Sequence, residues 1–420
     1  GQSACGDGNM DSDADGTIAI GYTALQALTS GIGNVAIGYQ ALDAEDDGDY
    51  SVAVGHQALT AQTGTTGTVA NVAVGYQAAS GLTSATGVTA IGYKAGGSAT
   101  MTGAVNTLVG SQAGMALIGG ERNTIMGADA CDAMTIGDDN IAIGVGAMGD
   151  ASTSDGIDKN IFIGNYSGDE IAANAVANVV AIGYATMSGT VTAAVAGTVC
   201  IGYQSQLSLE TGVANTSLGY ATLQTNIAGD YNTAIGHQAL QMFNAADVGQ
   251  NTCVGINAGQ ALDTGVSNTV VGAFAFDAAN GTESNNTAVG DNALGAFTTN
   301  GVNRNVAVGV MALGTATDGN SNTAIGSRSM GNALVTGDNN VAIGESAGFA
   351  TTSGASNVII GAAAGNAVAA GGENVFIGQE AAAQCTSAGR NVVVGRLANT
   401  ATDNGYENVF GWDVDSAGAD

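Results

Sequence analysis

The stretch Asn34-Val-Ala-Ile-Gly-Tyr-Gln-Ala-Leu42 decides the fold, because its pattern recurs along almost the whole chain. It returns nearly unchanged at Asn232-Thr-Ala-Ile-Gly-His-Gln-Ala-Leu240. The glycine of this unit recurs 23 times, mostly 17 and at most 20 residues apart, at positions 21, 38, 55, 75, 92, 110, 127, 144, 164, 183, 202, 219, 236, 255, 272, 290, 309, 326, 344, 361, 378, 395 and 411. A fixed period of this size is typical of a solenoid, in which each repeat forms one coil. We therefore expect an all-β, parallel β-solenoid (β-roll) of about 23 coils of 17–20 residues.

The repeats divide the chain into three parts. We expect an acidic N-terminal segment at 1–16, a solenoid domain at 17–414 and a C-terminal tail at 415–420. Little sequence lies outside the repeats to cover the end coils, and open solenoid ends expose unpaired strand edges. The expectation is either a segment of a longer fibre or end-to-end stacking of copies.

Residues before the repeat glycine, which is numbered position 0, have the composition of a strand. Position −3 is Val, Ile or Thr in 22 of the 23 repeats, and position −1 is apolar in every repeat. Position −2 points to the opposite face, and it is Ala in 12 repeats. A strand that is apolar on both faces is normally covered on both. One cover is the interior of the coil, and the other is a second copy of the chain or, alternatively, a second sheet with long loops.

The residues after the glycine are less regular. We expect the glycine to end the strand, where backbones approach closely or φ is positive, and position +3, a small residue in 22 repeats, to be a tight site. The weaker apolar stretches that follow, such as 24–28 and 258–262, are interpreted as a second strand. Position −4 is Asn in 17 repeats, and stacked Asn side chains are expected to hydrogen-bond as a ladder.

Position +1 carries a recurring aromatic residue. Tyr occupies it in several coils, and the two histidines, His56 and His237, replace Tyr in the same slot. Two interpretations remain open. The row is either an exposed stripe that binds sugars or partners, or it packs over the edge of the turn.

Composition limits the classes of partner. The chain has 36 acidic against seven basic residues and a net charge of −29, which repels nucleic acid and anionic membranes. The acidity fits solubility, calcium binding or a salty habitat. Cys200 and Cys253 stand at the usual Ala position and are expected to be buried, whereas Cys5 lies outside the repeats and could join chains. The uncharged run 171–209 is interrupted by Asn, Thr and Gly, so no membrane span is expected.

The segments Asn34-Val-Ala-Ile-Gly38, Asn322-Thr-Ala-Ile-Gly326 and Asn340-Val-Ala-Ile-Gly344 resemble the head repeat of trimeric autotransporter adhesins, the YadA-like left-handed parallel β-roll. Similar repeats occur in bacteriophage tail fibres. The resemblance covers about residues 17–414. It implies a homotrimer on a three-fold axis, exposure at a cell or virion surface, and adhesion to a host receptor or glycan. The repeat is longer than the typical head repeat, and neither a heptad stalk nor a membrane barrel follows, which puts autotransport in doubt.

Calcium is the one cofactor that the sequence suggests. The run Asp11-Ser-Asp13-Ala-Asp15-Gly16 matches the first half of a calcium loop, with carboxylates at alternate positions and a glycine for the turn. Tyr22 stands where the bidentate glutamate would be, so the alternative is a solvated acidic segment. The run 45–49 is a weaker candidate of the same kind.

Catalytic patterns in the sequence coincide with the repeat. Gly144-Val-Gly-Ala-Met-Gly149 fits a dinucleotide fingerprint, but its first glycine is the repeat glycine and no βαβ unit surrounds it. Gly344-Glu-Ser-Ala-Gly348 fits a hydrolase elbow, but both histidines precede the serine. We therefore expect no enzyme. The sequence predicts an extracellular structural fibre for surface adhesion, with a bacteriophage tail-fibre segment and a self-assembling filament without a binding role as alternatives.

Overall fold

The computed structural model is all-β in the part that it describes, which comprises residues 3–5, 14–63, 67–97, 100–151, 157–171, 176–192, 195–246, 248–298, 301, 303–332, 334–387, 389–400 and 406–412. Within these residues no segment is helical, so none forms a helix long and apolar enough to cross a membrane. The chain divides into two compact units, Gly1–Ala214 (unit 1) and Asn215–Asp420 (unit 2).

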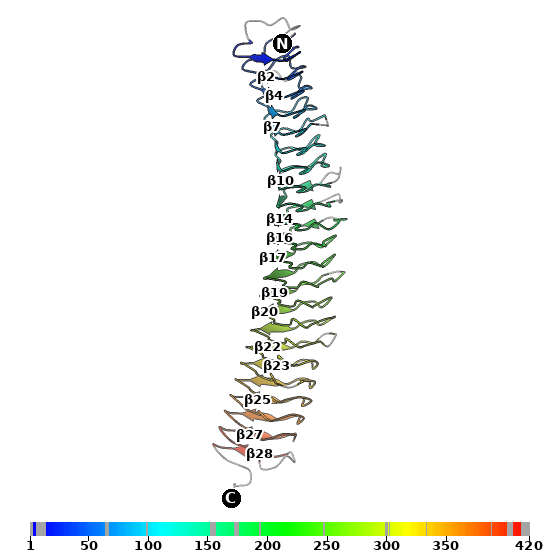
Figure 1. Cartoon of the computed structure of the whole chain (residues 1–420). Helices are drawn as coiled ribbons and strands as arrows, with labels where there is room; N and C mark the ends of the chain where they lie inside the picture. Colours follow the sequence, from blue (N-terminus) through cyan, green and yellow to red (C-terminus); the bar gives the residue numbers. More distant parts are fainter. Residues whose placement is uncertain are drawn as a thin grey trace. The chain divides into compact units, whose positions relative to one another are not determined.

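Unit 1 is a stack of coils whose main strands pair in parallel with the strand of the next coil (Figure 1). These three-residue strands are β1 (Ile18–Ile20), β2 (Val35–Ile37), β4 (Val52–Val54), β6 (Val72–Val74), β7 (Thr89–Ile91), β8 (Thr107–Val109), β9 (Thr124–Met126), β10 (Ile141–Ile143), β12 (Ile161–Ile163), β14 (Val180–Ile182) and β16 (Val199–Ile201). Two-residue strands precede some of them and pair among themselves: β3 (Gly48–Asp49) with β5 (Gly67–Thr68), and β11 (Ile157–Asp158) with β13 (Val176–Ala177) and β15 (Val195–Ala196).

Unit 2 repeats the same arrangement, one three-residue strand per coil, each parallel to the next. Its strands are β17 (Thr216–Leu218), β18 (Thr233–Ile235), β19 (Thr252–Val254), β20 (Thr269–Val271), β21 (Thr287–Val289), β22 (Val306–Val308), β23 (Thr323–Ile325), β24 (Val341–Ile343), β25 (Val358–Ile360), β26 (Val375–Ile377), β27 (Val392–Val394) and β28 (Asn408–Phe410). The predicted fold class is confirmed, a parallel β-solenoid of about 22 turns.

Each strand turns its middle residue into the coil and its two flanking residues outward. In β2 the side chain of Ala36 is fully buried, and Ala36 pairs in register with Ala53 of the next coil. Ile37 beside it is 37% exposed. Small residues at the middle position fit because the interior is thin and is completed by buried residues after the glycine, such as Ala41 and Leu42. Cys200 and Cys253 fill the middle position and are buried, as predicted.

The predicted second strand is wrong. Residues 24–27 and 258–261 form turns, not extended chain. The reason is an alternation in backbone conformation: Gln40 and Leu42 have φ of 52° and 50°, on either side of Ala41. This alternation aims successive N–H groups at opposite neighbours, so Gln40 N donates to Tyr22 O at 2.9 Å and Leu42 N to Ala58 O at 3.0 Å. The turn is thereby bonded to the coils on both sides without extended geometry.

The repeat glycine and the Asn row both behave as predicted. Gly38 has φ of 144°, and a Cβ added to it would collide with the carbonyl oxygen of Gly55 in the next coil. In the Asn row, Asn123 Oδ1 accepts from the backbone N–H of Asn140 at 3.0 Å and from Nδ2 of Asn140 at 3.1 Å. Asn140 Nδ2 also donates to Ile157 O at 2.7 Å. These buried amides tie three successive coils together on the strand's N-terminal side.

Candidate functional site

An uncharged, partly exposed sheet face is the first functional feature. It consists of positions −3 and −1 of each coil and is called the outer sheet face below. None of the 23 repeats places Asp, Glu, Lys, Arg or His at either position. In unit 1 the side chains remain partly open to solvent, with Ile37 37% and Ile91 40% exposed. Apolar surface that continues from coil to coil in this way is typical of a protein–protein contact.

A row of stacked aromatic rings flanks the outer sheet face in unit 1. This aromatic row consists of position +1 in five successive coils: Tyr22, Tyr39, His56, Tyr76 and Tyr93. The ring centroids are 5.5, 4.8, 5.2 and 5.5 Å apart along the row, and the rings are nearly parallel. The four tyrosines are 43–49% exposed, and His56 is exposed as well. Position +1 is thus a surface row, which fits both the exposed stripe and packing over the edge of the turn.

Glutamines at position +2 run beside the aromatic row. Gln57 Nε2 donates to Gln40 Oε1 at 2.9 Å, and Gln77 Nε2 donates to Gln57 Oε1 at 2.9 Å. This glutamine ladder went unnoticed in the sequence, although Gln recurs at a fixed offset from the glycine. Lys94 ends the ladder, with Nζ 5.5 Å from the centroid of the Tyr93 ring. Among these residues there is no carboxylate.

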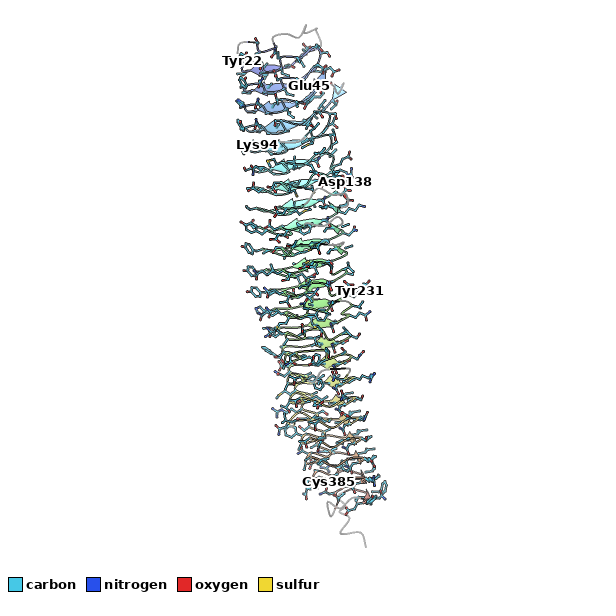
Figure 2. The ribbon with its side chains drawn as sticks, turned by 90° about the vertical axis from the view of Figure 1, so that its right-hand side faces the viewer. Tyr22, Glu45, Lys94, Asp138, Tyr231 and Cys385 are labelled. Carbon is cyan, nitrogen blue, oxygen red and sulfur yellow. The ribbon has the colours of Figure 1, made fainter. Side chains whose placement is uncertain are left out.

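Acidic side chains gather on other parts of unit 1. Figure 2 shows Tyr22 and Lys94 on one edge of the coils and Asp138 on the opposite edge. Asp138 and Asp139 there bind Arg122, whose Nε lies 2.7 Å from Asp139 Oδ1. The guanidinium of Arg122 lowers the pKa of Asp139 from its ordinary value through this hydrogen bond. The aromatic edge and the charged edge are therefore chemically distinct.

The predicted calcium ligands are only partly visible. Asp11 and Asp13 lie outside the described residues, and Asp15, in a turn, accepts from Gly33 N through its backbone oxygen at 2.9 Å. The weaker candidate brings carboxylate oxygens of Glu45, Asp46 and Asp47 within 4.8 Å of one another. Glu45 is buried, however, and bonds the N–H groups of Asp47 and Gly48 and the amide of Gln62. The Glu45 carboxylate therefore already has a structural role, because its hydrogen bonds hold the loop at 45–48 in place.

A second group of carboxylates lies on three neighbouring coils, at Asp132, Asp150 and Asp169. Partial burial raises the pKa of Asp132, and the charges of Asp129 and Asp150 raise it further. Burial likewise raises the pKa of Asp169, with added repulsion from Asp150, Glu170 and Asp132. When folding raises the pKa of a carboxyl, the contribution of that carboxyl to stability is complete below its unfolded pKa. The contribution is lost as the pH rises through the folded pKa.

This sign gives a prediction for Asp150→Asn. At pH 7 the substitution removes repulsion, so the urea midpoint of unfolding is expected to rise. Well below the ordinary Asp pKa of 3.8 the carboxyls of Asp132 and Asp169 are protonated in both the folded and the unfolded state, and the gain is expected to vanish. Asp139→Asn is the control of opposite sign, because it removes the partner of Arg122. A lower midpoint for Asp150→Asn at pH 7 would contradict the proposed repulsion.

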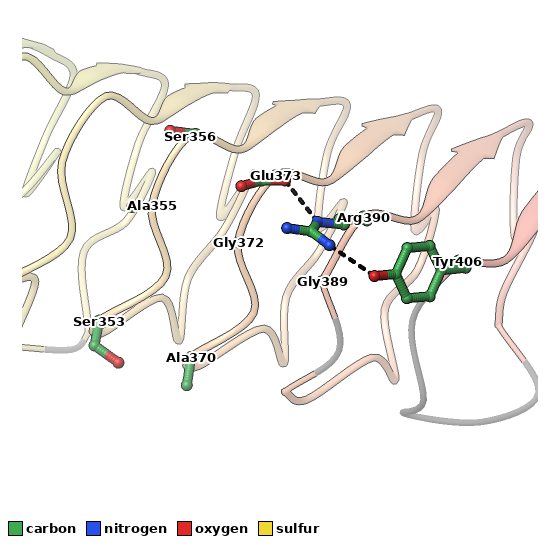
Figure 3. Close-up of a pocket in the computed structure, with 9 residues that line it drawn as sticks. All are labelled: Ser353, Ala355, Ser356, Ala370, Gly372, Glu373, Gly389, Arg390 and Tyr406. Carbon is green, nitrogen blue, oxygen red and sulfur yellow. Dashed lines mark hydrogen bonds and ion pairs between the residues drawn. The ribbon is translucent and has the colours of Figure 1, made fainter.

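A shallow hollow of about 530 Å³ lies in unit 2, lined by Ser353, Ala355, Ser356, Ala370, Gly372, Glu373, Gly389, Arg390 and Tyr406 (Figure 3). Arg390 Nε donates to Glu373 Oε2 at 2.8 Å, and its Nη1 donates to the Tyr406 hydroxyl at 2.6 Å. These hydrogen bonds raise the pKa of Arg390, and the bond that Arg390 donates to Glu373 has the largest effect. Arg390, the one cation among the described lining residues, is therefore paired, and an exposed pair of this kind contributes little stability.

The residues that the sequence singled out do not converge on one catalytic centre in the described part of the chain. His56 lies between Tyr39 and Tyr76 in the aromatic row, and His237 stacks on Tyr220 at 5.0 Å in unit 2. Both therefore occupy the tyrosine slot, as predicted. The surfaces available for function are the outer sheet face and the aromatic row with its glutamine ladder. A scan against protein-family models and a search of curated proteins found no match for the chain.

Proposed function

We propose that this protein is a structural component of an extracellular fibre, in which stacked solenoid coils act as a stiff support for adhesion to a surface. The observation that carries the proposal is the outer sheet face, which stays uncharged from coil to coil, with an apolar residue at position −1 throughout and Val, Ile or Thr at position −3 in 22 of the 23 repeats. The coil-to-coil hydrogen bonds of strands, turns and Asn row supply the stiffness. The resemblance to heads of trimeric adhesins points in the same direction.

Copies of this chain are the proposed cover of the outer sheet face, and a homotrimer is the expected assembly. Parallel sheets are normally buried on both faces, and burying each Å² of apolar surface contributes about 25 cal/mol. Two chains that each carry a net charge of −29 repel one another wherever carboxylates meet. A face without charges is therefore where copies can approach.

The test introduces charge into this face. In Ile37→Lys/Ile91→Lys, each association would bury ammonium groups without partners, at a cost of several kcal/mol. We expect the wild-type chain to sediment as a trimer and the variant as a monomer. The matched control is Ile118→Lys/Ile136→Lys, because these loop isoleucines are 42% and 40% exposed, much like Ile37 and Ile91, but lie off the sheet. The control is expected to remain trimeric.

Electron microscopy of the same preparations separates the remaining possibilities. Discrete particles of trimer mass support the adhesive fibre component. Long filaments would favour a self-assembling filament instead. A wild-type chain that sediments as a monomer at micromolar concentration would refute assembly through the outer sheet face.

A further inference from the structure

The aromatic row along five coils of unit 1 and the glutamine ladder along three of them form one strip without carboxylates, bordered by Lys94 and called the tyrosine–glutamine strip below. Because the rings stack face to face, each ring covers the faces of its neighbours and turns its edge to solvent. The phenol oxygens of Tyr22, Tyr39, Tyr76 and Tyr93 have no hydrogen-bond partner among the described residues. The strip thus presents hydroxyl and amide groups in a straight line.

We propose that the tyrosine–glutamine strip binds a neutral, extended polysaccharide of β-1,4-linked sugars that lies along the stacked coils. This inference deepens the adhesive role proposed above and rests on it. It assigns adhesion to a defined row of side chains, separate from the outer sheet face through which copies are proposed to associate.

The repeat distance of the strip supports a sugar polymer. Successive rings are 4.8 to 5.5 Å apart, which is close to the advance of one sugar ring in an extended β-1,4-linked chain. A peptide strand advances by about 3.3 Å per residue and a polyproline helix by about 3.1 Å, so neither would stay in step with the rings. A matching polymer places one sugar ring at every coil and, because successive sugars are turned over, repeats the same contact at every second coil. Several weak contacts on one chain together give a higher affinity than any one of them.

The chemistry of the strip selects a neutral, hydroxyl-rich ligand. A phenol hydroxyl both donates and accepts hydrogen bonds, and a glutamine amide donates through its nitrogen and accepts through its oxygen. Sugar hydroxyls also donate and accept, so they can pair with both kinds of group. The described residues of the strip include no carboxylate, so nothing in the strip attracts a cationic ligand in preference to a neutral one. The chain's charge of −29 disfavours polyanions by long-range repulsion. Uronic-acid and sulfated polymers are therefore excluded from the proposal.

The experiment titrates the full chain with cellohexaose and chitohexaose in a calorimeter. The test variant is Tyr22→Phe/Tyr39→Phe/Tyr76→Phe/Tyr93→Phe, which retains the stacked rings but removes four hydroxyls. We expect the wild-type chain to bind at least one hexasaccharide and the variant to bind it at least about tenfold more weakly. Tyr50→Phe is the control, since Tyr50 is an exposed tyrosine of unit 1 outside the row, and it is expected to bind like the wild type.

Three binding results would overturn the proposal: no binding of either hexasaccharide by the wild-type chain, equal binding by the tetra-Phe variant, or equally tight binding of alginate, a polyanion. A loss of the trimer in the tetra-Phe variant would likewise overturn it, because the row would then lie between copies. The oligomeric state of Ile37→Lys/Ile91→Lys is measured separately by sedimentation. Trimer formation without sugar binding refutes only the strip, and a monomeric wild type that still binds sugar refutes only the assembly.

Discussion

Gly110→Ala is expected to lower the free energy of unfolding by roughly 2–6 kcal/mol. Gly110 has φ of 143°, a conformation that costs an L-residue about 1–3 kcal/mol. The added Cβ would also lie only 2.6 Å from the carbonyl carbon of Gly127 in the next coil, and overpacking of this kind costs about 1–3 kcal/mol more. Neither coil can move aside, because both are bonded to further coils. Urea unfolding followed by circular dichroism measures the change.

Gly119→Ala is the matched control for this substitution. Gly119 lies in a loop nine residues further along the chain, and a Cβ there would have no heavy atom within 4 Å. Its free energy of unfolding is expected to stay within about 0.5 kcal/mol of the wild-type value. Equal effects of the two substitutions would show that close stacking of the repeat glycines does not limit stability.

Asn357→Ala is expected to destabilise unit 2 by roughly 2–5 kcal/mol. Asn357 Nδ2 donates to Asn340 Oδ1 and to Gly371 O, each at 2.9 Å, and Asn357 Oδ1 accepts from the N–H and the Nδ2 of Asn374 at 3.0 and 2.9 Å. Alanine leaves these buried groups without their partner, at about 1–3 kcal/mol for each group that water cannot reach. Thermal and urea unfolding give the size of the loss.

Asn366→Ala serves as the comparison, since this asparagine is exposed in the turn of the same coil. Its effect is expected to stay within about 0.5 kcal/mol. If Asn357→Ala unfolds at the same urea concentration as Asn366→Ala, the Asn row is not a source of stability.

Much of the fold could be predicted because the strand and its glycine follow simple rules. Side chains alternate between the two faces of the strand, so the small residue at position −2 predicted which side chain is buried inside the coil. Gly38 lies where only glycine fits. The turn after the glycine escaped prediction for a physical reason. Positive φ usually reveals itself through Gly or Asn, but here Gln40 and Leu42 adopt it because coil-to-coil hydrogen bonds hold them there.

The candidate site, too, could be predicted only in part from the sequence. The Tyr and His residues at position +1 predicted the aromatic row, because residues at the same offset in each coil lie one above another. The stacking geometry and the bonded glutamines depend on side-chain rotamers, which repeat spacing alone does not specify. The Asp15 motif, by contrast, is local and independent of stacking, and calcium binding there stays a prediction.

The Asn and strand ladders connect residues that are only 16 to 20 positions apart in a chain of 420. Parallel sheets usually require distant segments to meet, which slows folding. Here each strand finds its partner after one short loop has closed, and the finished coil offers an ordered edge to the next. A nascent chain can therefore build this structure progressively during synthesis, adding one coil for each stretch of about 17 residues that becomes available.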